Sequence, residues 1–175
     1  MKRISFLMLV VILTLVMPQF ASALSSRTVL DDNQIEQIRN NCSITQATLS
    51  RVHISDALIR VNLGRQYEAL STKLMAPFNS RAALNKLDAT NLVGTTTKYE
   101  NALNNFRTEY QAYEQTVSKA LQIDCKNNPA SFHETVAEAQ EKRKRVSSSV
   151  AELNKLIAEY RTNFNQFAKG VSNGQ

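Results

Sequence analysis

The sequence predicts an all-α protein, an up-down-up three-helix antiparallel bundle with coiled-coil-like packing, formed after cleavage of a signal peptide. The chain has only 4 Gly and 3 Pro in 175 residues, and tight turns need residues that tolerate special backbone angles. Apolar residues recur at spacings of three, four and seven along three long stretches, which is typical of helices with one buried face. The composition fits one domain of ordinary size and excludes collagen-like, disordered and disulfide-dense proteins.

Residues 1–23 have the pattern of a secretory signal peptide. Lys2 and Arg3 precede the apolar run from Ile4 to Met17, and Ala21-Ser22-Ala23 resembles a signal peptidase site. The run of 14 residues is shorter than the roughly 20 that span a bilayer, and no lipoprotein Cys follows it. We expect cleavage after Ala23 and a single mature domain, 24–175, that is secreted or extracytoplasmic and does not span the membrane. Retention of the segment as an anchor is the alternative.

The first helix is predicted over about residues 31–76. Asp31 supplies a helix-starting carboxylate, and the helix can restart at Asn40-Asn41. Pro77 lacks an N–H and disrupts a helix interior, so the helix should end near residue 76 or kink, with a short cap helix over 81–88. One continuous helix from 31 to 87 is the alternative. Its heptad seam contains Asp56 at one core position, and the apolar members are Ile35, Cys42, Leu49, Leu63 and Leu70, with Ile38, Val52 and Ile59 beside them.

The second and third helices are predicted over about 91–125 and 132–169. Ser131 and Glu134 have the spacing of a capping box at the start of the third helix, and Gly170 offers a stop. Arg143 is the one residue out of place in the third stripe. The second stripe contains Leu92, Tyr99, Leu103, Phe106, Tyr110, Tyr113, Val117, Leu121 and Cys125; the third contains Val136, Ala139, Val146, Val150, Leu153, Ile157, Tyr160, Phe164 and Phe167.

The two cysteines are predicted to form one disulfide, Cys42 to Cys125, because both lie in apolar stripes of an exported chain. The spans from Cys42 to Ala76 and from Asn91 to Cys125 each cover 34 residue steps, about 51 Å of helix. Rods of equal length place both cysteines at one end of the bundle. Reduced buried thiols, intermolecular pairing and a zinc site with His133, for which no fourth ligand is identifiable, are the alternatives.

The sequence contains no recognisable catalytic constellation, so we expect no enzyme, no cofactor and no metal site. Nucleophilic catalysis needs a base beside a Ser or Cys, and the candidate bases, His53 and His133, have positions better explained by structural roles. Gly64 and Gly94 have no phosphate-binding motif around them.

The basic residues are the candidate binding residues. From Arg39 to Lys86 the chain has seven basic residues against two acids. We identify Lys142, Lys144, Arg145, Arg60 and Arg65 as candidates for contact with a protein or with an anionic polymer or lipid surface outside the cell. Export and the lack of aromatic residues between the bases argue against nucleic acid, and an ordinary solvated surface is the alternative.

The signal ending Ala21-Ser22-Ala23, the cysteine pair and the stretch Leu70-Ser71-Thr72-Lys73-Leu74-Met75 resemble those of small secreted helical-bundle proteins of bacteria. That resemblance implies a fold and a compartment, and it implies no activity. Size, basic balance and helical content are also similar to periplasmic chaperones of the OmpH/Skp type, although the cysteines and the lack of strand-rich segments differ from that family.

These observations favour a non-enzymatic extracytoplasmic protein that acts by binding a cell-envelope or surface partner. A periplasmic holdase-type chaperone is the second hypothesis. A carrier of a small apolar ligand is the third, based on the aromatic stripe that contains Tyr99, Phe106, Tyr110 and Tyr113. The oligomeric state stays open, because a heptad seam serves self-association as well as internal packing.

Overall fold

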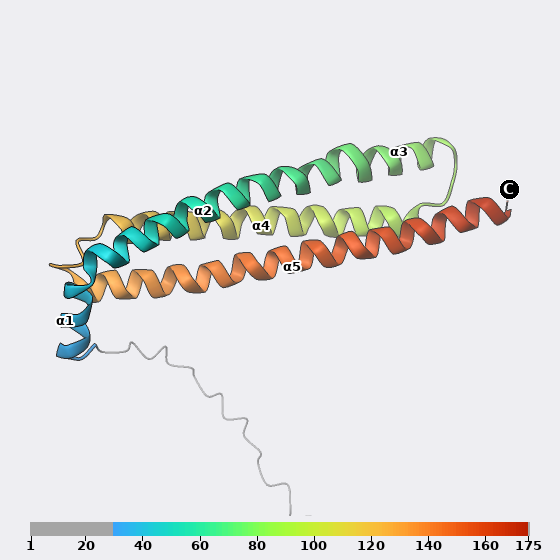
Figure 1. Ribbon diagram of the computed structural model, residues 1–175. Coiled ribbons are helices and arrows are strands. Elements are labelled where there is room, and N and C mark those ends of the chain that lie inside the picture. Colours follow the sequence, from blue (N-terminus) through green and yellow to red (C-terminus); the bar gives the residue numbers. More distant parts are fainter. Residues whose placement is uncertain (1–29, 175) are drawn as a thin grey trace, which may run out of the picture.

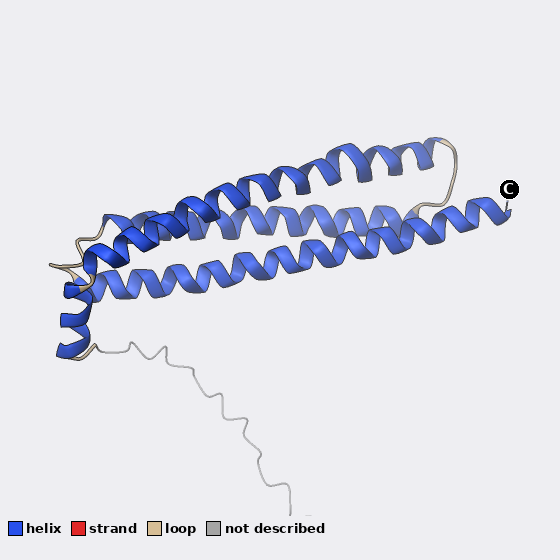
Figure 2. Cartoon of the chain, viewed as in Figure 1, coloured by secondary structure: helices blue, strands red, loops and turns tan. Residues whose placement is uncertain are grey.

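The computed structural model describes residues 30–174, and these residues form helices and short connections without any strand. The predicted all-α class is therefore confirmed for this part of the chain (Figure 2). The predicted signal peptide, 1–23, lies outside the described residues. In order, the elements are α1 (Asp32–Asn40), α2 (Cys42–Ala69), the π-helical segment η1 (Leu70–Met75), α3 (Ala76–Leu84), α4 (Thr90–Gln122) and α5 (Pro129–Gly174).

The helix predicted over 31–76 is broken near its start. Asp31 caps α1 as expected, because its carboxylate accepts the backbone N–H of Gln34 while the Gln34 side chain accepts that of Asp31. The chain turns at Asn41 and α2 begins at Cys42, which confirms the predicted restart. Figure 1 shows α1 turned away from the direction of α2, across the end of the molecule. Arg39 Nε donates to the carbonyl of Lys126 at 3.2 Å and ties α1 to the loop before α5.

The predicted end at residue 76 and the separate cap helix over 81–88 are wrong. The chain stays helical through Pro77 to Leu84, because the turn before the proline widens into η1. The backbone N–H of Ala76 bonds to the carbonyl of Ser71, five residues earlier, which is the spacing of a π-helix. We attribute the tolerance of Pro77 to this wider turn, since a proline ring clashes with the preceding turn of a regular α-helix.

The π-helical segment also shifts the buried face by one residue. Leu84, which the heptad reaches through Pro77, is 83% exposed. A regular heptad continued from the buried Tyr67 would place Leu74 and Arg81 on the inner side, yet Leu74 is 52% exposed and Arg81 is exposed as well. Met75 and Ala82 are buried in their place, at 1% and 4% exposure. Just before η1, the carbonyl of Tyr67 accepts a hydrogen bond from the buried Tyr99 hydroxyl at 3.0 Å.

The predicted boundaries around the last loop also need correction. α4 ends at Gln122, and α5 begins at Pro129 rather than at residue 132. The expected capping box at Ser131 and Glu134 does not start the helix, because Pro129 takes the first helical position, where its missing N–H costs nothing. The Asp124 carboxylate accepts the backbone N–H groups of Lys126 and Asn127 and so shapes the loop. α5 continues past Gly170 to Gly174.

The core lies mainly between α4 and α5, which share the most extensive interface, and α4 also contacts α2. Figure 1 shows the three long helical segments side by side, with α2 crossing in front of α4 and with α3 on the opposite side of α4 from α5. All three predicted stripes contribute to the core. Val52 and Ile59 of the first stripe and Phe164 of the third are exceptions, at 37%, 51% and 38% exposure. The buried apolar side chains of α4 and α5 in this core are those of Leu92, Tyr99, Leu103, Phe106, Tyr113, Val117, Ala139, Val146, Leu153, Leu156 and Tyr160.

A second, smaller core surrounds the cysteine pair at the end where α1 lies. The Sγ atoms of Cys42 and Cys125 lie at disulfide-bonding distance, and their Cα atoms are 5.6 Å apart. Phe132 is buried with them, and Ile38, Leu49, Ile123 and Val136 pack around the cluster. The cysteines therefore meet although the first helix does not end at Pro77.

Replacing both Cys42 and Cys125 by Ser should lower the free energy of unfolding by about 4 kcal/mol, because the bond closes a long loop in the unfolded chain. Urea unfolding of a protein that comprises residues 24–175, followed by circular dichroism, measures the difference. Adding reductant to the unmodified protein should cause a similar loss and should leave the double variant unchanged. Equal stability of the oxidised protein and the variant would show that the pair contributes nothing.

Candidate binding surface

The basic run of α5, residues 142–145, does not form a single patch. Lys142 Nζ lies 2.7 Å from the Glu138 carboxylate and donates to the Thr116 hydroxyl of α4 at 2.7 Å. Lys144 Nζ lies 2.6 Å from the Glu141 carboxylate, and Arg145 is exposed. Consecutive residues of a helix point in different directions, so these predicted binding residues lie on different sides of α5.

Arg143, the residue out of place in the third stripe, bonds to Asp56, the residue out of place in the first. Arg143 Nε and Nη2 donate to the two carboxylate oxygens of Asp56 at 2.6 and 3.0 Å, which is the two-pronged geometry of strong guanidinium pairs. The Tyr113 hydroxyl of α4 donates to the same carboxylate at 2.9 Å. These contacts join α2, α4 and α5 at one level of the molecule.

The surroundings of Asp56 and Tyr113 shift the pKa values of both side chains. Asp56 is 6% exposed, yet the Arg143 guanidinium holds the pKa of its carboxyl below the ordinary value, against the opposing effect of burial. Burial, together with the hydrogen bond to Asp56, raises the pKa of Tyr113. The carboxylate is thus held charged inside the protein, which requires the arginine to stay in place.

The remaining two predicted binding residues, Arg60 and Arg65, lie on α2. Arg60 is half-buried, and its positive charge contributes to lowering the pKa of Asp56. Arg65 is exposed on α2 and lies beside a hollow of about 480 Å³ that Val61, Glu68, Lys73 and Arg107 also line. The structure therefore does not bring Arg60 and Arg65 together with the basic run of α5 in one site.

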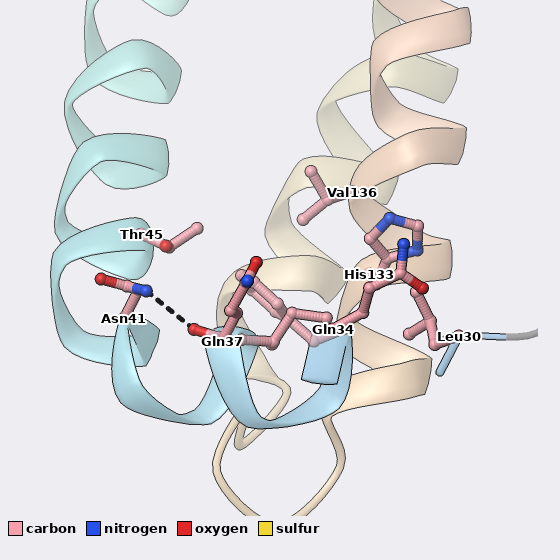
Figure 3. A pocket seen from close by; sticks show the side chains of 9 residues that line it. Leu30, Gln34, Gln37, Asn41, Thr45, His133 and Val136 are labelled. Atoms are coloured by element: carbon pink, nitrogen blue, oxygen red, sulfur yellow. Dashed lines mark hydrogen bonds between the residues drawn. The ribbon is translucent and has the colours of Figure 1, made fainter. Parts of the chain in front are cut away.

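His53 has a carboxylate partner, and His133 lies where α1 meets the start of α5. His53 Nε2 lies 2.5 Å from the Glu114 carboxylate of α4. His133 lines a hollow of about 370 Å³ between α1 and the start of α5, and Figure 3 shows it there beside Leu30 and Gln34. Because Cys42 and Cys125 are paired with each other, the alternative of a zinc site with His133 loses its thiolate ligands.

The aromatic stripe of α4 serves the core. Tyr99, Phe106 and Tyr113 are 0%, 3% and 2% exposed, and Tyr67 packs edge-on against Phe106 at 5.8 Å. Packing thus accounts for the residues on which the carrier hypothesis was based. A groove of about 400 Å³ does lie between α2, α4 and α5, lined by Leu49, Val52, Val117, Val136 and Ala139 among others.

The feature that the sequence analysis missed is the number of large apolar side chains that α2 exposes to solvent. α2 has apolar residues on several sides, and only the inner seam was recognised. The signal that reveals the others is the spacing of Ile54, Leu58 and Val61, which recur at intervals of four and three. The exposed set on α2 consists of Ile44 (69%), Val52 (37%), Ile54 (59%), Leu58 (64%), Ile59 (51%) and Val61 (47%).

In comparisons with known proteins, no protein-family model, curated protein or solved structure matches the chain. Within residues 30–174, no helix is both long and apolar enough to cross a membrane.

Asp56 and Arg143 should be coupled in stability. Arg143→Leu should lower the free energy of unfolding by about 3 kcal/mol, because it leaves a buried carboxylate without its counter-charge. Asp56→Asn should cost less, about 1 kcal/mol, because the Arg143 side chain is 52% exposed and regains water. In the double variant the two costs should fall well short of their sum. Additive costs in urea unfolding at pH 7 would contradict the coupling.

The ion pair between Asp56 and Arg143 determines in which direction the free energy of unfolding changes with pH. Because the folded pKa of Asp56 lies below the ordinary 3.8, its contribution is present above that value and is lost as pH falls through the folded pKa. The stability gap between the unmodified protein and Asp56→Asn should therefore close in acid and stay constant from pH 5 to 7. A gap that does not narrow at all between pH 5 and pH 2 would show that the aspartate acts through packing alone.

Proposed function

We propose that this chain is a non-enzymatic extracytoplasmic helical-bundle protein that acts by binding a cell-envelope or surface protein through α2. The observation that carries the proposal is the set of six large apolar side chains exposed on this one helix. Contiguous exposed apolar surface on a small protein usually marks an interaction site.

The location outside the cytoplasm is part of the proposal. The cysteine pair is compatible with an oxidising compartment, where disulfides persist, and the N-terminal pattern of Lys2, Arg3 and the following apolar run supports export. We further propose that the mature domain, 24–175, is an up-down-up three-helix bundle. The contacts of Cys42 with Cys125, of Asp56 with Tyr113 and of Asn79 with Thr96 support this, because the residue number rises on one partner while it falls on the other.

The basic residues contribute the electrostatic part of the same proposal. Arg65 lies on α2 close to the exposed apolar residues, while Lys142 and Lys144 have carboxylate partners on α5 itself. This distribution favours a protein partner with acidic groups over an anionic polymer or lipid spread across α5.

A photo-crosslinking amino acid at Leu58 tests the proposal in cells that produce the full chain. The expected result is a discrete adduct with an envelope protein, because Leu58 lies in the middle of the exposed apolar residues. The matched control places the same amino acid at Asn165, which is exposed on α5, and should give no such adduct. Identical adducts from both positions, or none from Leu58, would overturn the proposal.

A holdase-type chaperone is the second candidate, because exposed apolar side chains also hold unfolded chains. Such a protein should suppress aggregation of a urea-unfolded client, diluted into buffer, at a near-equimolar ratio. Leu58→Ser should reduce that suppression several-fold, whereas Asn165→Ser should not. Light scattering that is unaffected by the mature protein would exclude this function.

A further inference from the structure

One line of residues on α2 has the spacing of a second coiled-coil seam. Arg51, Ile54, Leu58, Val61 and Arg65 follow one another at intervals of three, four, three and four, and all five are exposed. We call these five residues the outer stripe. Each residue of an α-helix is rotated by about 100° from the last, so Leu58 points away from the side of α2 on which Asp56 is buried. α2 therefore has one seam toward the core and another toward solvent.

The outer stripe has the width that is expected for contact with another helix. Ser55 and Asn62 border it on one side, and Ser50 and Ala57 border it on the other. A narrow apolar line between small and polar residues is typical of a coiled-coil seam. A helix that lies in a membrane surface has a broad apolar face instead, so the observations favour a helix as the occupant over a lipid bilayer.

The charges on α2 indicate what kind of helix it receives. The two carboxylates of α2, Asp56 and Glu68, are bonded to Arg143 of α5 and Arg107 of α4. The outer stripe itself has an arginine at each end, and Lys73 lines the hollow next to Val61, in which Glu68 and Arg107 neutralise each other. The electrostatic complement of this surface is acidic.

The same charges argue against a second copy of this chain as the occupant. In a parallel α2–α2 pair, Arg51 faces Arg51 and Arg65 faces Arg65. In an antiparallel pair centred on Leu58, Arg51 faces Arg65. Either arrangement places like charges opposite each other, and the nearest carboxylate along α2, that of Glu68, is already bonded to Arg107 of α4. This disfavours the pairing of two copies.

We propose that the outer stripe binds an acidic amphipathic helix of a partner protein, with its apolar seam on Ile54, Leu58 and Val61 and its carboxylates facing Arg51 and Arg65. This inference rests on the proposed function, since it names the chemistry of the partner that α2 receives. The binding mode is a helix laid along a helix, in which the apolar seam gives affinity and the flanking charges choose the partner.

Two synthetic 28-residue peptides test the proposal against the mature protein with its disulfide intact. Both have a heptad seam of Ile and Leu, one with Glu and the other with Lys at the flanking positions. Fluorescence anisotropy should show at least tenfold tighter binding of the Glu peptide at low salt. The double variant Arg51→Glu with Arg65→Glu should reverse this preference, and Leu58→Ser should weaken binding of the Glu peptide at least tenfold.

The matched control is Arg81→Glu with Arg161→Glu, which makes the same change in net charge at two exposed positions away from the outer stripe. It should keep the preference for the Glu peptide. Circular dichroism of each variant verifies that the helices remain. Equal binding of the two peptides, or the same response in both double variants, would overturn the proposal.

Two further outcomes would assign the surface to another occupant and also overturn the proposal. One is binding to phosphatidylglycerol vesicles, lost in Leu58→Ser, with neither peptide bound. The other is a concentration-dependent dimer in analytical ultracentrifugation that Leu58→Ser abolishes.

Envelope adducts from Leu58 combined with peptides that show no charge preference would leave the proposed function standing and remove only the acidic helix. Absence of the adducts removes the proposed function itself.

Discussion

The ion pair between Asp56 and Arg143 is the constraint on which the position of α2 depends. α2 exposes many of its large apolar side chains, so apolar burial alone holds it weakly against α4 and α5. Polar and covalent contacts hold it and its continuation along their length, among them the cysteine pair at one end, Asp56 with Arg143 and Tyr113 in the middle, and Asn79 with Thr96 and Tyr160 near the other end. Further contacts with α4 join His53 to Glu114, Glu68 to Arg107 and the Tyr67 carbonyl to the Tyr99 hydroxyl. Buried polar groups of this kind fix register rather than add much stability, which is compatible with the exposed outer side of α2.

α4 and α5 form a different kind of unit. Their interface is continuous and apolar, and the interior of the molecule is mostly theirs. The polar contacts between them, such as Asn105 with Ser149 at 3.1 Å, lie at its margin. The molecule thus combines a well-packed helical pair with a third helix attached at a few points, and the candidate binding surface lies on the attached helix.

The sequence predicts much of this architecture, and it fails where the answer depends on how helices are rotated against each other. The pairing of the two cysteines is predictable from the expected compartment and from the position of both cysteines in apolar stripes. Asp56 and Arg143 each stood out in their own stripes, but their partnership required the rotation of α5 relative to α2, which spacing along one chain does not give. Pro77 predicted an end to the helix because a regular turn cannot accept it, and the wider turn before it has no signature in apolar spacing. The spacing of Ile54, Leu58 and Val61 is visible in the sequence, but spacing alone does not show which of two apolar seams on one helix faces the core.

The π-helical segment has a consequence for ancestry. A widened turn is one residue more than a regular helix needs, so it is equivalent to a single-residue insertion between Leu70 and Met75. A homologue without that residue would align with this chain over α4 and α5 without a gap and would need a one-residue gap in the first long helix. In such a homologue the heptad would run unbroken, and the side chains that face inward beyond the gap would be the counterparts of Met75 and Ala82. A comparison of the two chains by heptad phase alone would therefore lose the match between them at the same point.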